Sequence, residues 1–187
     1  NKVLLNQVIP ASDLTIIPLS PIEIDQLEFD KNGGELLVNS DENDKVVVKS
    51  IKVQQGYSGV IQNAKIEGTV SIGIASNLEI NGVNLESSTL DCSISDSYSP
   101  ILGQALITGD LKSIPKSIKL TKRNVGQLLA NEKFLIARPS GREGNDFDCE
   151  EWGKRITEYQ SPYNSYDCSA DNSLYAINKN KDPDGGK

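Results

Sequence analysis

The 187-residue sequence contains neither methionine nor histidine. The first absence bears on how the chain was processed, and the second limits the catalytic mechanisms it could use. A primary translation product starts with methionine, so a chain that opens on Asn1 leads us to expect a cleaved secretory signal, with an excised domain of a longer protein as the alternative. Ser-His-Asp and Cys-His catalytic arrangements are excluded because the base that activates their nucleophile is missing.

Cysteine is scarce, and its three residues cannot all pair within one chain. Cys149 and Cys168 share one polar segment and would close a loop of about 20 residues, for which a disulfide contributes ~3 kcal/mol to stability. We therefore predict a Cys149–Cys168 disulfide. Cys92 lies in an alternating apolar stretch and is interpreted as a small buried side chain, with an intermolecular bridge as the alternative. Three dispersed cysteines also lack the paired spacing of a structural zinc site.

Long hydrophobic runs and excess positive charge are absent too. No stretch approaches the ~18 apolar residues of a membrane-spanning helix, so we expect no membrane span. The net charge of −7 disfavours a nucleic-acid partner.

A basic run contains no aromatic side chain for base stacking and is interpreted as a solvated strand face. The alternatives are contact with an acidic polysaccharide, an anionic surface or the acidic N-terminal part of a neighbouring copy. Its members are Lys112, Lys116, Lys119, Lys122 and Arg123.

Aromatic residues make up only 5% of the chain, so its core must consist mainly of Ile, Leu and Val, which favours strands. Apolar residues alternate with polar ones over residues 22–94, as in half-buried strands. Asn81-Gly82 between two short apolar runs predicts a hairpin over residues 78–85, and the turn at residues 30–34 predicts another. One short helix is expected over residues 121–131.

These short strands predict a mainly β fold, with a β-sandwich or jelly-roll-like core as the first choice. A β-solenoid is the second choice, because no fixed period of 20 to 50 residues runs through the chain. We divide the sequence into an apolar N-terminal extension (1–20), a β-rich core (21–138) and a Tyr-, Gly- and Asp-rich appendage (139–187) stapled by the disulfide.

The N-terminal extension holds two apolar runs interrupted or ended by proline, which is typical of edge or isolated extended segments. Its apolar side chains are candidates for assembly by strand addition: Val3, Leu5, Val8, Ile16 and Ile17. Charge is also segregated: residues 1–44 hold nine acidic groups and two lysines, and residues 111–138 hold seven basic groups and one glutamate. Head-to-tail stacking would use this asymmetry, and two unequal solvated faces are the alternative.

The appendage offers two further candidate sites. An aromatic cluster forms either a recognition surface for sugars or proteins or a small core around the disulfide; it comprises Trp152, Tyr159, Tyr163 and Tyr166. Residues 180–185 place Asn180, Asp182 and Asp184 at alternate positions before a glycine, as in the start of a calcium-binding loop, and a flexible polar terminus is the alternative. Residues 145–151 form a second oxygen-rich cluster. We expect no other cofactor.

The sequence thus predicts a non-catalytic extracellular or cell-surface subunit, structural or adhesive, whose partner is another copy of itself in an oligomer or fibre, or surface glycans or proteins. A secreted carbohydrate- or protein-binding module that uses the aromatic cluster is the alternative. An enzyme that uses two carboxylates ranks third, because 26 acidic residues make some close pair inevitable.

Overall fold

The computed structural model describes residues 1–94, 106–122, 133–140 and 146–180. Within them the chain forms one short helix, α1 (Cys149–Lys154), and two sheets of eight strands each. The first sheet contains β1 (Val3–Val8), β3 (Ile22–Phe29), β5 (Val46–Val48), β6 (Ile51–Val53), β8 (Lys65–Ile72), β10 (Asn84–Ile94), β12 (Ser117–Lys122) and β14 (Ile156–Glu158). The second contains β2 (Asp13–Ile16), β4 (Glu35–Val38), β7 (Ser58–Gln62), β9 (Asn77–Asn81), β11 (Leu106–Gly109), β13 (Lys133–Pro139), β16 (Leu174–Ile177) and β15 (Ser165–Cys168).

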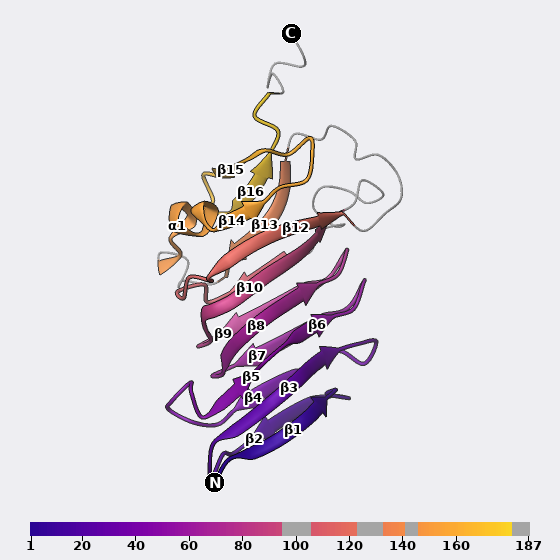
Figure 1. The fold of residues 1–187 in the computed structure, drawn as a ribbon, viewed down its shortest axis with the longest axis vertical. Coiled ribbons are helices and arrows are strands. Elements are labelled where there is room, and N and C mark those ends of the chain that lie inside the picture. The colour runs from indigo at the N-terminus through magenta and orange to yellow at the C-terminus, as the bar shows by residue number, and fades with distance from the viewer. Residues whose placement is uncertain (95–105, 123–132, 141–145, 181–187) are drawn as a thin grey trace.

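The arrangement is a β-solenoid. Through most of the chain, successive strands pass from one sheet to the other, and each pairs in parallel with strands of the coils before and after it. The coils stack along the long axis of the molecule, with β1 and β2 at one end and β15 and β16 towards the other (Figure 1). The prediction of a mainly β chain is confirmed, but the structure shows the second choice and not the β-sandwich or jelly roll.

Both predicted hairpins are wrong. β9 pairs with β7 and β11, whereas β10 pairs with β8 and β12 in the opposite sheet; β3 and β4 likewise lie in different sheets. A type I′ turn needs positive φ at both central residues, but here only Gly82 has it, at +62°. Gly82 instead forms a corner of the solenoid, stacked one coil above Asn63, whose φ is 61°.

The core lies between the two sheets and consists of columns of aliphatic side chains. Each inward-facing residue stacks on its partner in the next coil, and one column runs through six strands of the first sheet: Leu27, Ile51, Val70, Leu90, Ile118 and Ile156. All six are buried. Aliphatic side chains of similar width fit these close, regular columns, which explains why the chain needs few aromatic residues.

In the C-terminal part of the chain, parallel strand pairing in the second sheet gives way to antiparallel pairing. β16 pairs antiparallel with both β13 and β15, while β14 adds to the other sheet, and α1 packs against β14, β15 and β16. We call residues 146–180 the C-terminal cap. The helix expected over residues 121–131 is not found at its start, because Thr121 and Lys122 belong to β12, and its remainder lies outside the described residues.

Replacing the fully buried Leu90 by alanine should lower the free energy of unfolding by about 2–5 kcal/mol, because a void would interrupt the column in the middle of the first sheet. Urea denaturation followed by circular dichroism measures the change. Glu86→Ala on the exposed side of the same strand is the matched control and should shift stability by no more than about 0.5 kcal/mol. Equal effects of the two substitutions would contradict the core described here.

Candidate functional site

The N-terminal end of the solenoid is formed by two edge strands. β1 pairs only with β3 in the first sheet, and β2 pairs only with β4 in the second. We call residues 1–20 the N-terminal edge. The expectation that these proline-punctuated segments are edge strands is therefore confirmed, and both strands complete the sheets of their own chain.

Apolar side chains are exposed along this edge. Leu19 is 98% exposed, Leu4 66% and Ile17 65%, and smaller parts of Val3, Ile9 and Leu14 are also exposed. In the described part of the chain, Tyr57 is the only other large hydrophobic side chain that is exposed. Terminal coils of solenoids normally present a polar outer face to water, and the outer face of this coil is instead partly apolar.

The backbone of β1 is half unpaired. The N–H of Val3 donates to the carbonyl oxygen of Pro21 at 2.9 Å, which directs the main-chain groups of Val3 towards β3. Main-chain groups of successive residues point to opposite sides of a strand, so the N–H of Leu4 points away from the sheet. The alternation is interrupted after Leu5: Val8 pairs with Leu27, whose own N–H donates to Ser50 on the far side of β3, so Val8 faces β3 again. The outward N–H of Leu4 has no strand beside it in the described part of the chain.

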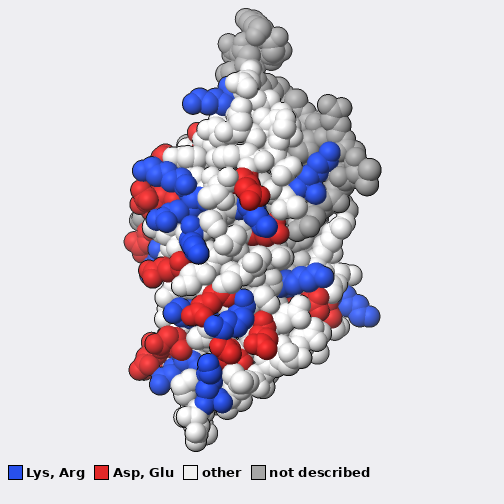
Figure 2. Space-filling view, viewed as in Figure 1, with Lys and Arg blue, Asp and Glu red and all other residues white. Residues whose placement is uncertain are grey.

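Few charged side chains protect this edge from pairing with another strand. Natural edge strands are commonly guarded by charged side chains or proline within the strand, but β1 has neither. Lys2 precedes β1 and pairs with Glu23 at 3.4 Å, and Asp13 is the only charged residue of β2. The lowest part of the face in Figure 2, at the N-terminal end, is correspondingly free of charge, in contrast to the mixed charges above it.

The five predicted assembly residues divide into two groups. Val3 and Ile17 are exposed, whereas Leu5, Val8 and Ile16 are half-buried and pack against the core. The sequence interpretation missed Leu4, Leu14 and Leu19. Leu4 lies next to the inward-facing Leu5, so alternation along an edge strand was the signal that identifies it as exposed. Leu14 shares a face of β2 with Ile16 and stacks on the buried Leu36, so alternation does not identify it as exposed.

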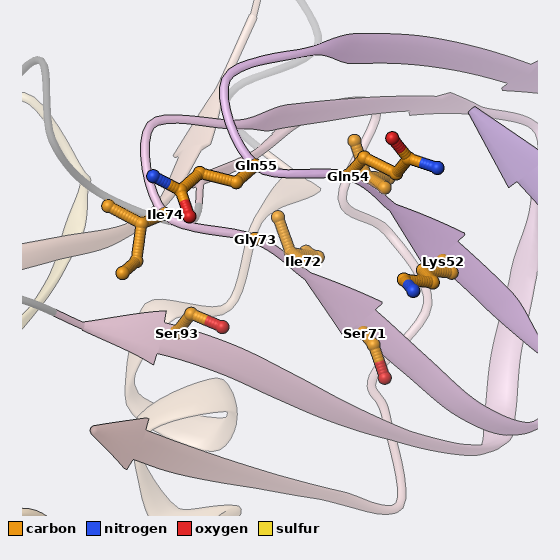
Figure 3. Close-up of a pocket in the computed structure, with 9 residues that line it drawn as sticks. Lys52, Gln54, Gln55, Ser71, Ile72, Gly73, Ile74 and Ser93 are labelled. Carbon is orange, nitrogen blue, oxygen red and sulfur yellow. The ribbon is translucent and has the colours of Figure 1, made fainter. Parts of the chain in front are cut away.

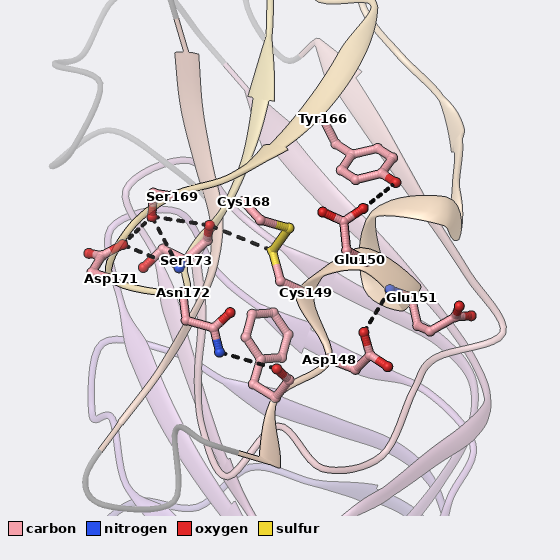
Figure 4. The surroundings of a disulfide bond; sticks show 11 residues. Asp148, Cys149, Glu150, Glu151, Tyr166, Cys168, Ser169, Asp171, Asn172 and Ser173 are labelled. Atoms are coloured by element: carbon pink, nitrogen blue, oxygen red, sulfur yellow. Dashed lines mark hydrogen bonds between the residues drawn. A yellow bond between two sulfur atoms is a disulfide. The ribbon is translucent and has the colours of Figure 1, made fainter.

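The C-terminal cap is held together by the predicted Cys149–Cys168 disulfide (Figure 4). Asp148 caps the start of α1 by accepting a hydrogen bond from the Glu151 N–H at 3.2 Å. The Tyr166 hydroxyl donates to Glu150 at 2.9 Å, and this bond raises the pKa of Tyr166. Helix, disulfide and β15 thus form one connected unit.

The aromatic cluster lies mostly inside the cap. Trp152 is 0% and Tyr163 1% exposed, and Trp152 makes an edge-to-face contact with Phe147 at 5.3 Å. Tyr159 and Tyr166 are only partly buried and pack against the core, and burial raises the pKa of Tyr159 to about 12. Burial favours a core role over a recognition surface for Trp152 and Tyr163.

Cys92 lies in the interior on β10. It is a free cysteine, 1% exposed, and burial raises the pKa of its thiol to about 12. A neutral, enclosed thiol is a poor nucleophile. This placement agrees with the interpretation of Cys92 as a small core side chain, and it leaves no accessible sulfur for a bridge between chains.

The remaining candidates do not form a site. Asp182 and Asp184 lie outside the described residues, and Asn180 ends that range. Within the described ranges no group of three or more Cys, Asp or Glu side chains is arranged to hold a metal ion. Residues 146–151 of the second oxygen-rich cluster lie within these ranges and therefore form no such group. In the basic run, Lys112 contacts Asp110 and Asp146, while Lys119 lies on β12.

A hollow of about 540 Å³ lies where β6, β8 and β10 end (Figure 3). Its lining combines polar and aliphatic residues and includes Lys52, Gln54, Ser71 and Ser93. The Gln54 amide donates to Glu28 at 3.1 Å, and Lys52 lies 3.9 Å from the same carboxylate, so these polar groups mainly bridge neighbouring coils.

Comparison with known proteins identifies no relative. No protein-family model matches the chain, and no curated protein or solved structure is similar to it. Among the described residues no helix has the length and apolar character needed to cross a membrane. The N-terminal edge is therefore assigned as the candidate site on its geometry alone.

Replacing Cys149 and Cys168 together by serine should lower the free energy of unfolding by ~3 kcal/mol, because the loop of 19 residues loses its constraint in the unfolded state. Urea denaturation followed by the fluorescence of the buried Trp152 measures this change. Thiol titration of the unreduced wild-type protein provides the control, with no thiol reactive in the native state and one, Cys92, in denaturant. Recovery of three thiols would contradict the disulfide.

Proposed function

We propose that this chain is a non-catalytic structural or adhesive subunit of an extracellular assembly, and that it joins its neighbour by β-strand addition at the N-terminal edge. In strand addition, backbone hydrogen bonds between two molecules supply affinity, and side chains beside the new strand supply specificity. The observation that carries the proposal is that β1 and β2 both present an unpaired edge bordered by exposed apolar side chains.

The contrast between the two ends supports this reading. At the C-terminal end the sheets also finish in edge strands, β14 and β15, but α1 packs against both and the disulfide links α1 to β15. The N-terminal end has no comparable cover among the described residues, and leucine and isoleucine side chains exposed there favour contact with another apolar surface. An edge without protection is a template for strand pairing.

The disulfide supports an extracellular location, because such bonds persist mainly in oxidising compartments. The absence of histidine supports a non-catalytic role, since it removes the most common general base. The alternative function, a binding module built on the aromatic cluster, has weaker support, because Trp152 and Tyr163 have almost no exposed surface.

A labelled peptide with the sequence of residues 1–9 tests whether the edge accepts a strand. Its binding to the full chain, followed by fluorescence anisotropy, should be saturable and roughly tenfold weaker for Leu4→Pro, because proline removes one outward-facing N–H, a loss of ~1 kcal/mol that adds to its steric effect on pairing. The inward bonds of Val3 to β3 are kept.

Leu4→Val is the matched control, since it retains the N–H and an apolar side chain, and it should bind the peptide like the wild type. A peptide of the same composition in scrambled order controls for nonspecific apolar contact. Equal binding of the two peptides, or equal affinity of Leu4→Pro and Leu4→Val, would refute strand addition at this edge.

A further inference from the structure

We infer that a shallow hollow between two turns of the solenoid binds a neutral sugar ring of a glycan, which stacks on the side chain of Tyr57. The hollow has a volume of about 350 Å³ and is lined by residues 30–34, between β3 and β4, and by residues 56–60 of the next coil. Small-molecule sites begin at volumes of about 300 Å³, so the hollow has room for one ring. The inference goes beyond the proposed function, because the site is separate from the N-terminal edge and does not depend on strand addition.

Hydrogen bonds fix both turns before any ligand binds. The Gly33 N–H donates to the carbonyl oxygen of Asp30 at 2.9 Å, and the Tyr57 N–H donates to that of Gln54 at 3.0 Å. The strands that follow the two turns, β4 and β7, pair in parallel and hold the turns beside each other. The hollow is therefore preformed, which lowers the cost of ordering loops when a ligand binds.

Two glycines keep the floor of the hollow open. Gly33 and Gly56 have φ angles of +64° and +83°, in the left-handed region that favours glycine. A Cβ at Gly56 would meet no atom within 4 Å, and one at Gly33 would approach only the Ser58 carbonyl oxygen, at 3.8 Å. Because neither residue projects a side chain, a ligand can approach the backbone and lie flat beside Tyr57.

Tyr57 supplies the apolar surface of the hollow. It is 40% exposed, and it is the only aromatic residue that is exposed in the described part of the chain. A tyrosine ring is a rigid, flat contact surface that loses little conformational entropy on binding. The C–H face of a pyranose ring can pack on such a surface.

Hydrogen-bonding side chains border the same hollow. Asp30 and Lys31 supply one negative and one positive charge, and Asn32 and Ser58 supply groups that both donate and accept. Asp30 accepts a hydrogen bond from the backbone N–H of Asn32 at 3.0 Å. Among the described residues, the side chains of Lys31, Asn32 and Ser58 have no hydrogen-bond or ion-pair partner, so they are available to a ligand.

This combination of groups favours a neutral sugar over other ligands. A pyranose ring has an apolar C–H face and a rim of hydroxyl groups, which match an aromatic face bordered by donors and acceptors. The charges of Asp30 and Lys31 balance, so the hollow has no preference for an anion such as phosphate. A peptide strand would need an unpaired sheet edge, and β4 and β7 each have a strand on both sides.

The hollow shown in Figure 3 lacks this combination, although it borders the same turn through Gln54 and Gln55. No aromatic side chain lines it, and both Gln54 and Lys52 contact Glu28 of the neighbouring coil. Its polar groups therefore join coils, whereas those around Tyr57 are available to a ligand.

Titration of the isotope-labelled full chain with hexasaccharides tests the inference by NMR chemical-shift mapping. The neutral probes are cellohexaose, mannohexaose and N-acetylchitohexaose, and hexagalacturonate is the anionic comparison. At least one neutral probe should shift the backbone amide signals of residues 30–34 and 56–60 saturably, while the signals of the C-terminal cap stay in place. Shifts confined to other residues, binding of the anionic probe alone, or no shift with any probe at millimolar concentration would overturn the inference.

Substitution of Tyr57 tests the stacking contact. Tyr57→Ala should weaken binding of the probe about tenfold, because the flat apolar surface is lost, while its circular dichroism stays unchanged. Tyr57→Phe keeps the ring and is the matched control, so it should bind like the wild type. Leu19→Ala truncates the most exposed hydrophobic side chain, outside the hollow, and should have no effect. Equal affinities of Tyr57→Ala and Tyr57→Phe would contradict the stacking contact.

Asn32→Ala tests the polar border of the hollow. The turn uses the backbone N–H of Asn32 and not its side chain, so this substitution keeps the turn and should weaken binding severalfold. An affinity equal to that of the wild type would exclude Asn32 as a sugar contact.

Different ligands report on this inference and on the proposed function. The peptide of residues 1–9 should bind Tyr57→Ala and the wild type alike, and the sugar probe should bind Leu4→Pro and the wild type alike. Loss of sugar binding alone therefore overturns the site at Tyr57, and loss of peptide binding alone overturns strand addition.

Discussion

The structure depends on the parallel, in-register stacking of inward-facing aliphatic side chains between two sheets. Each coil buries its residues against the coils on either side, so the column from Leu27 to Ile156 is continuous through the first sheet. The same stacking leaves both ends with unsatisfied strands. At the C-terminal end a disulfide-stapled helix packs against the edge strands β14 and β15, and at the N-terminal end the edge strands β1 and β2 have no such helix among the described residues. The candidate site is therefore a consequence of the architecture, because a solenoid always has two ends to satisfy.

Much of the strand content follows from alternation in the sequence, but the way the strands pair does not. A solenoid repeat is recognisable when its coils have equal length, and here they differ. Ile61 pairs with Ile80, 19 residues further on, whereas Ile107 pairs with Ala137, 30 residues on, and Ile118 with Ile156, 38 residues on. Corners of variable length hide the period. Asn81-Gly82 was misleading for a related reason: a glycine with positive φ serves a solenoid corner as well as a hairpin, and only the partner strand distinguishes them.

The site was predicted in part. Proline-punctuated apolar runs correctly indicated edge strands, and the Cys149–Cys168 pairing followed from spacing and elimination. Which apolar residues are exposed depends on the direction that each side chain takes in the first coil. The sequence therefore did not predict Leu4 and Leu19 as exposed residues, and it predicted Leu5, which is half-buried, as an assembly residue. The aromatic cluster illustrates the opposite difficulty. Trp152 and Tyr163 suit a surface or a small core equally well by composition, and only the packing of α1 against β15 decides for the core.

The position of the disulfide has one more consequence. Contacts in this fold run mainly between adjacent coils, so the reduction of Cys149–Cys168 affects the last coil directly and the first coil only through every layer between them. Reduction of the disulfide would therefore loosen the C-terminal end and leave the packing of the N-terminal coil largely unchanged. The local stability of one end of the solenoid is thus nearly independent of the other end, so a mutation or a change of environment at one end has little effect on the stability of the other.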